Sequence, residues 1–66
     1  MTTDDIRAAL QDLATSLDKR AAAAGQLAKD HAYAGSIGDY GRCAGKAEAY
    51  AHAAELVRAE LAQLVG

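Results

Sequence analysis

The sequence predicts an all-α protein, a two-helix antiparallel hairpin that dimerises into a four-helix bundle. Eighteen of the 66 residues are alanine, the best helix former, and proline is absent. Apolar residues recur at alternating spacings of three and four along two long segments, as in helices that pack lengthwise. A short glycine-containing segment separates them, and a short connection makes neighbouring helices antiparallel. Because two helices alone cannot enclose a core, we expect a homodimer.

The first helix is expected over residues 3–34. Thr2 or Thr3 can cap its N-terminus, with two aspartates in the first turn, where carboxylates interact favourably with the helix dipole. Gly25 lies inside this helix and costs about 1 kcal/mol relative to alanine, for which close packing is the one explanation the sequence offers. The expected inward stripe is Ile6, Leu10, Leu13, Leu17, Ala21, Ala24, Leu27 or Ala28, and His31.

The turn is expected over residues 35–38. Gly35 can take the left-handed conformation that ends many helices. Ser36 then serves as the cap of the second helix, with Asp39 completing an imperfect capping box. Alternatively, Asp39 is itself the cap, and a longer loop runs from Gly35 to Gly38.

The second helix is expected over residues 39–65. Its seam follows an unbroken three–four spacing: Tyr40, Cys43, Ala47, Tyr50, Ala54, Val57, Leu61 and Leu64. In an antiparallel hairpin the bulky residues gather at the end where the termini lie, and alanines face each other near the turn. We therefore expect most of the dimer interface at the open end. The core and dimer seam is assigned to Ile6, Leu10, Leu13, Leu17, Tyr50, Val57, Leu61 and Leu64.

Three glycines form a stripe on the second helix, roughly opposite the seam. The stripe is Gly38, Gly41 and Gly45, and it continues through Glu48 and His52. One interpretation is that Gly38 and Gly41 are loop or first-turn residues, and another is drift in a glycine-rich, GC-rich genome. The functional interpretation is a bare groove where a partner's backbone approaches closely. We name this stripe, together with the outward-facing Tyr33, as the candidate partner-binding surface.

No catalytic, cofactor-binding or metal-binding set can be assembled, so we expect a protein that is not an enzyme and has no cofactor. His31 and Cys43 fall on facing stripes, but the sequence lacks C-x-x-C and H-E-x-x-H motifs. His52 and Glu55 are three residues apart, which fits a solvated ion pair better than half of a di-iron site. No hydroxyl residue lies at a spacing from histidine that implies an activated nucleophile.

Charge and cysteine content favour a cytoplasmic protein with a protein partner. The formal net charge is −2, and the single cysteine excludes an internal disulfide. No signal peptide and no apolar run of about 20 residues are visible, so we expect no membrane association. The alternative is a small RNA- or DNA-binding regulator that uses Lys29, Arg42 and Lys46, although three acidic residues lie in the same region.

The segment from Gly41 to Leu56 follows the pattern G-x-x-x-G-x-x-x-A-Y-x-x-A-A-x-L. It resembles the second helix of short, alanine-rich helical-hairpin proteins of actinobacteria and their phages. The resemblance covers about a quarter of the chain. It implies a phage or prophage accessory protein that binds a host or virion protein, and it transfers no site residue.

Overall fold

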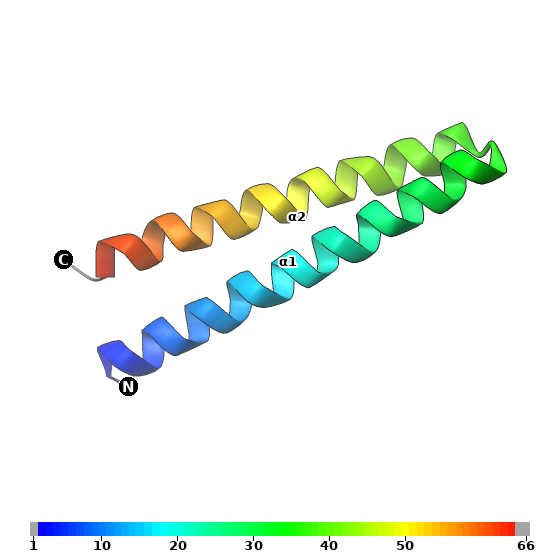
Figure 1. The fold of residues 1–66 in the computed structure, drawn as a ribbon. Helices are drawn as coiled ribbons and strands as arrows, with labels where there is room; N and C mark the ends of the chain where they lie inside the picture. The colour runs from blue at the N-terminus through cyan, green and yellow to red at the C-terminus, as the bar shows by residue number, and fades with distance from the viewer. Residues whose placement is uncertain (1, 65–66) are drawn as a thin grey trace.

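The computed structural model describes residues 2–64 as two long helices that pack side by side in opposite directions (Figure 1). Helix α1 spans Thr3–Ala34 and helix α2 spans Ile37–Leu64. The hairpin is therefore all-α, as the sequence predicts. The turn is shorter than the expected 35–38, because α2 begins at Ile37 rather than at 39. The expected end of this helix at 65 lies outside the described residues.

Helix α1 begins with a reciprocal capping box. The backbone N–H of Asp5 donates to Oγ1 of Thr2 at 3.2 Å, and the N–H of Thr2 donates to Oδ2 of Asp5 at 3.2 Å. Thr2, not Thr3, is thus the N-cap. Each bond satisfies a backbone donor that has no partner inside the helix, and Asp5 also places negative charge at the positive end of the helix dipole.

The turn is built on Gly35 in the left-handed conformation, with φ of 78°. Its N–H donates to the carbonyl of Ala32 at 3.2 Å, and the next N–H, of Ser36, donates to the carbonyl of His31 at 2.9 Å. The carbonyl of Ser36 then accepts from the N–H of Tyr40 at 2.9 Å, which starts α2. Glycine suits this position because a Cβ would strain a residue with this backbone conformation.

The contact between the helices is a narrow seam whose buried residues, in the described part of the chain, are all alanines: Ala14, Ala24, Ala28 and Ala54. On α2 the half-buried residues follow the expected seam from Cys43 to Leu64, while Tyr40 is exposed. On α1 the seam contains Leu10, Leu17, Ala21, Ala24, Ala28 and His31 as expected. It differs at Arg7 and Ala14, which take the places expected for Ile6 and Leu13.

Ile6 and Leu13, expected in the inward stripe, lie beside the seam and are exposed. Leu27 is exposed as well, so Ala28 is the inward residue of that pair. For Leu27 the physical reason is close approach near the turn: Ala28 lets the two backbones come near each other, and a leucine in its place would hold them apart. At the open end Arg7 is half-buried in the seam, and its Nη1 donates to Oδ1 of Asp4 at 3.1 Å.

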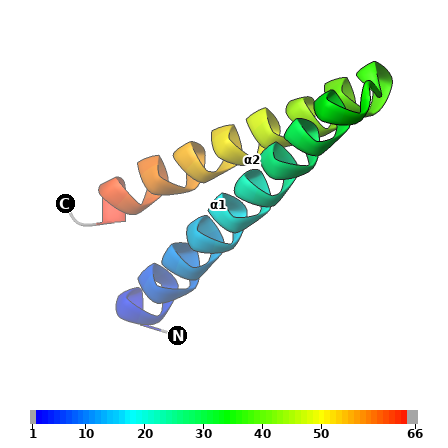
Figure 2. The same cartoon turned by 45° about the vertical axis from the view of Figure 1, so that its right-hand side comes forward.

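The hairpin is a rod with extents of 49 × 14 × 12 Å. Figures 1 and 2 both show the helices close together near the turn and farther apart toward the two termini, which lie at the same end. This divergence follows the sequence, because alanines face each other near the turn and larger residues do so toward the open end. Neither described helix has the length and apolarity required to cross a bilayer.

Candidate functional site

The seam divides the hairpin surface into two flanks, and an ion pair identifies the first. Nη1 of Arg58 on α2 donates to Oδ1 of Asp18 on α1 at 3.3 Å, and Nη2 donates to Oδ2. The hydrogen bonds and charge of Arg58 hold the pKa of the Asp18 carboxyl below its usual value. By helical periodicity this flank also carries Lys29, which lies 11 residues, or three turns, after Asp18. We call it the polar flank.

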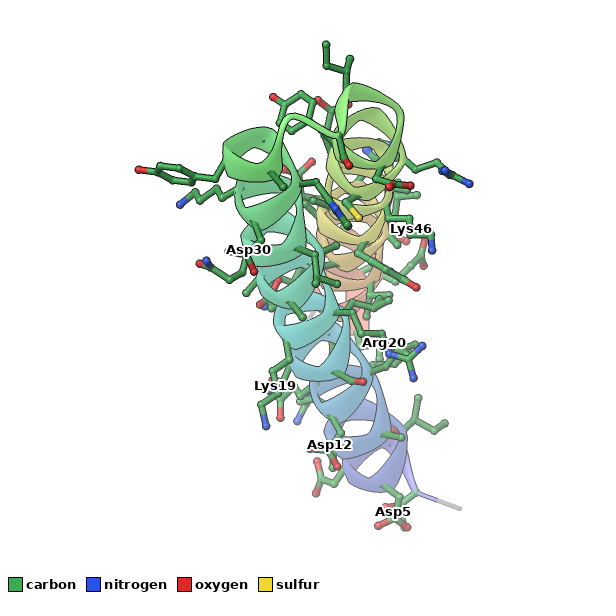
Figure 3. All side chains as sticks on the ribbon, turned by 90° about the vertical axis from the view of Figure 1, so that its right-hand side faces the viewer. Asp5, Asp12, Lys19, Arg20, Asp30 and Lys46 are labelled. Atoms are coloured by element: carbon green, nitrogen blue, oxygen red, sulfur yellow. The ribbon has the colours of Figure 1, made fainter. Side chains whose placement is uncertain are left out.

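The opposite flank is marked by Arg20 and Lys46, whose side chains lie on the same side of the hairpin in Figure 3. Each directly precedes a half-buried seam alanine, Ala21 on α1 and Ala47 on α2. Three large apolar residues share the position of Arg20 on α1 at spacings of seven and fourteen. These residues, which we call the apolar flank, are Ile6, Leu13 and Leu27, with exposed fractions of 39%, 47% and 51%.

The sequence places Ile6 and Leu13 in the inward stripe and in the core and dimer seam, and leaves Leu27 as an alternative to Ala28, so it does not predict this separate exposed flank. The signal that identifies it was present, since Ile6 and Leu13 are seven residues apart and Leu27 follows at twice that spacing. Residues seven apart lie on nearly one line of a helix. A second apolar line, through Leu10 and Leu17, made the two stripes hard to separate without the structure.

The glycine stripe lies in open space on α2. A Cβ built at Gly38, Gly41 or Gly45 would meet nothing within 4 Å among the described residues. Gly38 is in the first turn of the helix, as one interpretation held, whereas Gly41 and Gly45 lie beyond the first turn in regular helix. Packing within the chain therefore demands none of these glycines. Gly25 is similar, so close packing within the hairpin does not explain it.

The other proposed partner-binding residues are also exposed. Glu48 is exposed, and His52 forms an exposed contact with Glu55, Nδ1 to Oε2 at 3.9 Å. Tyr33 is 95% exposed near the turn. It lies 14 residues after Lys19, which points away from α2 in Figure 3, so Tyr33 is on the outer edge of α1. The glycine stripe is on the outer edge of α2, so the two do not share one face.

The basic residues of the nucleic-acid alternative are similarly divided. Lys29 lies on the polar flank, and Lys46 lies on the opposite side with Arg20 (Figure 3). Arg42 pairs with Asp39, Nη2 to Oδ1 at 2.7 Å. The helices thus place Lys29 and Lys46 on opposite sides of a rod rather than in one basic patch.

Residues with metal or redox chemistry lie in the seam near the turn. His31 and Cys43 are both half-buried there. Within residues 2–64, no group of three or more histidine, cysteine, aspartate or glutamate side chains is placed to hold a metal ion. The surface of the same residues contains no pocket.

Comparisons with known proteins add no relative: the chain matches no protein-family model, no curated protein and no solved structure.

Proposed function

We propose that this chain is a small, non-enzymatic regulatory protein that acts in the cytoplasm as a homodimer by binding another protein. The observation that carries the proposal is the imbalance of the hairpin: the described core buries alanines alone, while three large aliphatic side chains are exposed along one line of α1. Large apolar side chains gathered on one surface are typical of protein-binding surfaces. A small helical domain also gains stability from such contacts.

The dimer is proposed to be a four-helix bundle, which leaves the outer edges of the hairpin for the second protein. The glycine stripe, with Glu48 and His52, is the candidate surface on α2, and Tyr33 is a separate contact on α1. Bare glycines let a partner backbone approach closely, and an exposed tyrosine supplies a rigid amphipathic contact. We further propose that the chain is a phage or prophage product acting on a host or virion protein, on the basis of the resemblance of residues 41–56.

The experiment that tests this function is capture from a lysate. The tagged chain is incubated with a high-GC actinobacterial lysate, with and without nuclease, and the bound proteins are identified by mass spectrometry. We expect one protein to be enriched in both samples, and its enrichment to fall when Gly41→Ala and Gly45→Ala are combined. Gly25→Ala is the matched control, because it adds a methyl group to a helical glycine away from the stripe.

Two outcomes contradict the proposal in different ways. Enrichment that disappears with nuclease would favour the nucleic-acid alternative through Lys29, Arg42 and Lys46, and binding would then fall steeply with salt. Recovery of the chain alone would leave self-assembly as the function. If a partner is captured equally well by the double glycine variant, the chain binds proteins but not through the glycine stripe.

A further inference from the structure

We infer that the apolar flank is the surface on which a second copy of this chain docks. The inference rests on the homodimer of the proposed function and adds which face holds it. It differs from the sequence expectation, which placed the dimer in the same seam that joins the two helices. Toward the turn that seam is already filled, because α1 and α2 bury Ala24 and Ala28 between them, whereas the larger seam residues toward the open end are half-buried.

The apolar flank runs along most of the rod. Ile6, Leu13 and Leu27 form one line on α1, and the distance from the first to the last is about 32 Å at 1.5 Å per residue. On α2 the same side carries Lys46, Ala53 and Glu60, which follow one another at spacings of seven residues. Figure 3 shows this side by the labelled Arg20 and Lys46, one from each helix. This side of the hairpin therefore pairs an apolar line on α1 with a line of charged and small residues on α2.

The hairpin exposes more surface than a compact protein of its mass, and the excess is about the area that one partner contributes to an interface. The chain exposes 4750 Å² for a mass of 6.8 kDa. A compact monomer of this mass exposes about 4,000 Å². The excess is roughly 750 Å², close to the 800 Å² or so that each partner contributes to a standard interface. One additional contact of ordinary size thus brings the chain to the exposure of a compact protein.

A second copy suits this flank better than it suits the polar one. A two-fold dimer uses the same patch on both subunits, so the patch must complement itself. The large aliphatic side chains of the apolar flank are accompanied on the same side by charges of both signs, Lys46 toward the turn, Arg20 near the middle of the rod and Glu60 toward the open end. The polar flank would instead bury Asp18 and Arg58, whose loss of hydration opposes association.

Docking through the apolar flank also leaves the candidate partner surfaces free. Tyr33 and the glycine stripe lie on the outer edges of the two helices, roughly a quarter turn or more from the flank. Stacking two hairpins on this side gives every helix two neighbours, the arrangement of a four-helix bundle.

Analytical ultracentrifugation of the full chain and two variants tests the inference. We expect the wild type to be a dimer and Leu13→Asp to raise the dimer dissociation constant by more than about 100-fold, because a two-fold interface contains the substitution twice. The matched control is Ile37→Asp, which changes an equally aliphatic, 82% exposed residue at the turn and should leave the dimer unchanged. An unchanged dissociation constant for Leu13→Asp would overturn the inference.

A second measurement remains decisive if Leu13→Asp unfolds. In a Cys43→Ser background, Leu27→Cys should react with a maleimide more slowly as protein concentration rises, whereas Ile37→Cys should react at a constant rate. If the protein sediments as a dimer but the maleimide reaction rate of Leu27→Cys does not depend on protein concentration, the dimer uses another face. The proposed function would then still stand. A wild type that stays monomeric would overturn the homodimer and this inference together, without affecting partner capture.

Discussion

At the scale of single residues, Gly25 and Gly35 have opposite backbone requirements. Gly25 is in regular helix with open space around a built Cβ, whereas Gly35 has φ of 78°. We therefore expect Gly25→Ala to raise the free energy of unfolding by up to about 1 kcal/mol, and Gly35→Ala to lower it by about 1 kcal/mol or more. Urea unfolding followed by circular dichroism at one fixed protein concentration measures both. A loss of stability in Gly25→Ala would instead reveal a second chain close to this glycine.

The ion pair of Asp18 and Arg58 predicts a stability effect that depends on pH. Because Arg58 lowers the pKa of Asp18 in the folded chain, the pair stabilises the fold at pH values above the unfolded pKa of about 3.9. This contribution is lost as the pH falls through the lowered folded pKa. We expect Asp18→Asn to melt at a lower temperature than the wild type at pH 7, with the difference shrinking in acid.

Asp12→Asn is the control for that measurement. Asp12 is an exposed aspartate of the same helix, and Figure 3 shows its side chain away from α2. Its substitution removes the same charge without touching the ion pair. If both variants lose equal stability at pH 7, net charge rather than the Asp18–Arg58 contact explains the effect. Added salt should reduce the effect of Asp18→Asn, because the pair is exposed to solvent.

At the scale of the helices, α2 contains two glycines whose replacement by alanine should stabilise the helix. Gly41 and Gly45 lie in regular helix and have room for a methyl group. The double change to alanine is expected to raise the free energy of unfolding by about 2 kcal/mol, since each glycine costs about 1 kcal/mol relative to alanine. Thermal unfolding at fixed concentration measures this gain. If the double variant is more stable but captures less partner, the glycines serve binding. If its stability does not rise, a contact in the folded protein needs the glycines.

The elements themselves and most of the seam could be predicted from the sequence, but which residues enter the seam in the N-terminal half of α1 could not. Alanine content, Gly35 and the seam from Cys43 to Leu64 were sufficient for two helices and their antiparallel order. On α1, the large residues Ile6 and Leu13 were expected inside, whereas the structure places Arg7 and Ala14 there. Two adjacent apolar lines compete on this helix, and near the turn close approach of the backbones favours the one with alanines.

The grouping of candidate residues on one face could not be predicted either. A shift of one residue rotates a helix face by 100°, which is enough to move a side chain from one flank to the next. The exposure of single residues such as Tyr33 could be expected from their neighbours. Whether Lys29 shares a face with Lys46 depends on the rotation of both helices, and this requires the packed structure.

At the scale of the whole molecule, the packing within a single hairpin contributes little stability without a second copy. Its described buried residues are alanines, each of which removes little apolar area from water. If folding and dimerisation are coupled, the folded state is favoured by mass action. The rod shape fits this view, because the radius of gyration is 15.1 Å whereas a compact chain of this length has about 11 Å.

The resulting prediction is a melting temperature that rises with protein concentration, measured by circular dichroism over a wide dilution series. Gly25→Ala is the informative control, because it stabilises one helix without changing the number of chains in the folded state. Its melting temperatures should be higher than those of the wild type by a similar amount at every concentration, giving two parallel lines. A wild-type melting temperature that does not change with concentration would mean that the capping box, the Asp18–Arg58 pair and alanine's helix propensity suffice for a stable monomer. In that case the exposed leucines of the apolar flank would need a different partner to explain them.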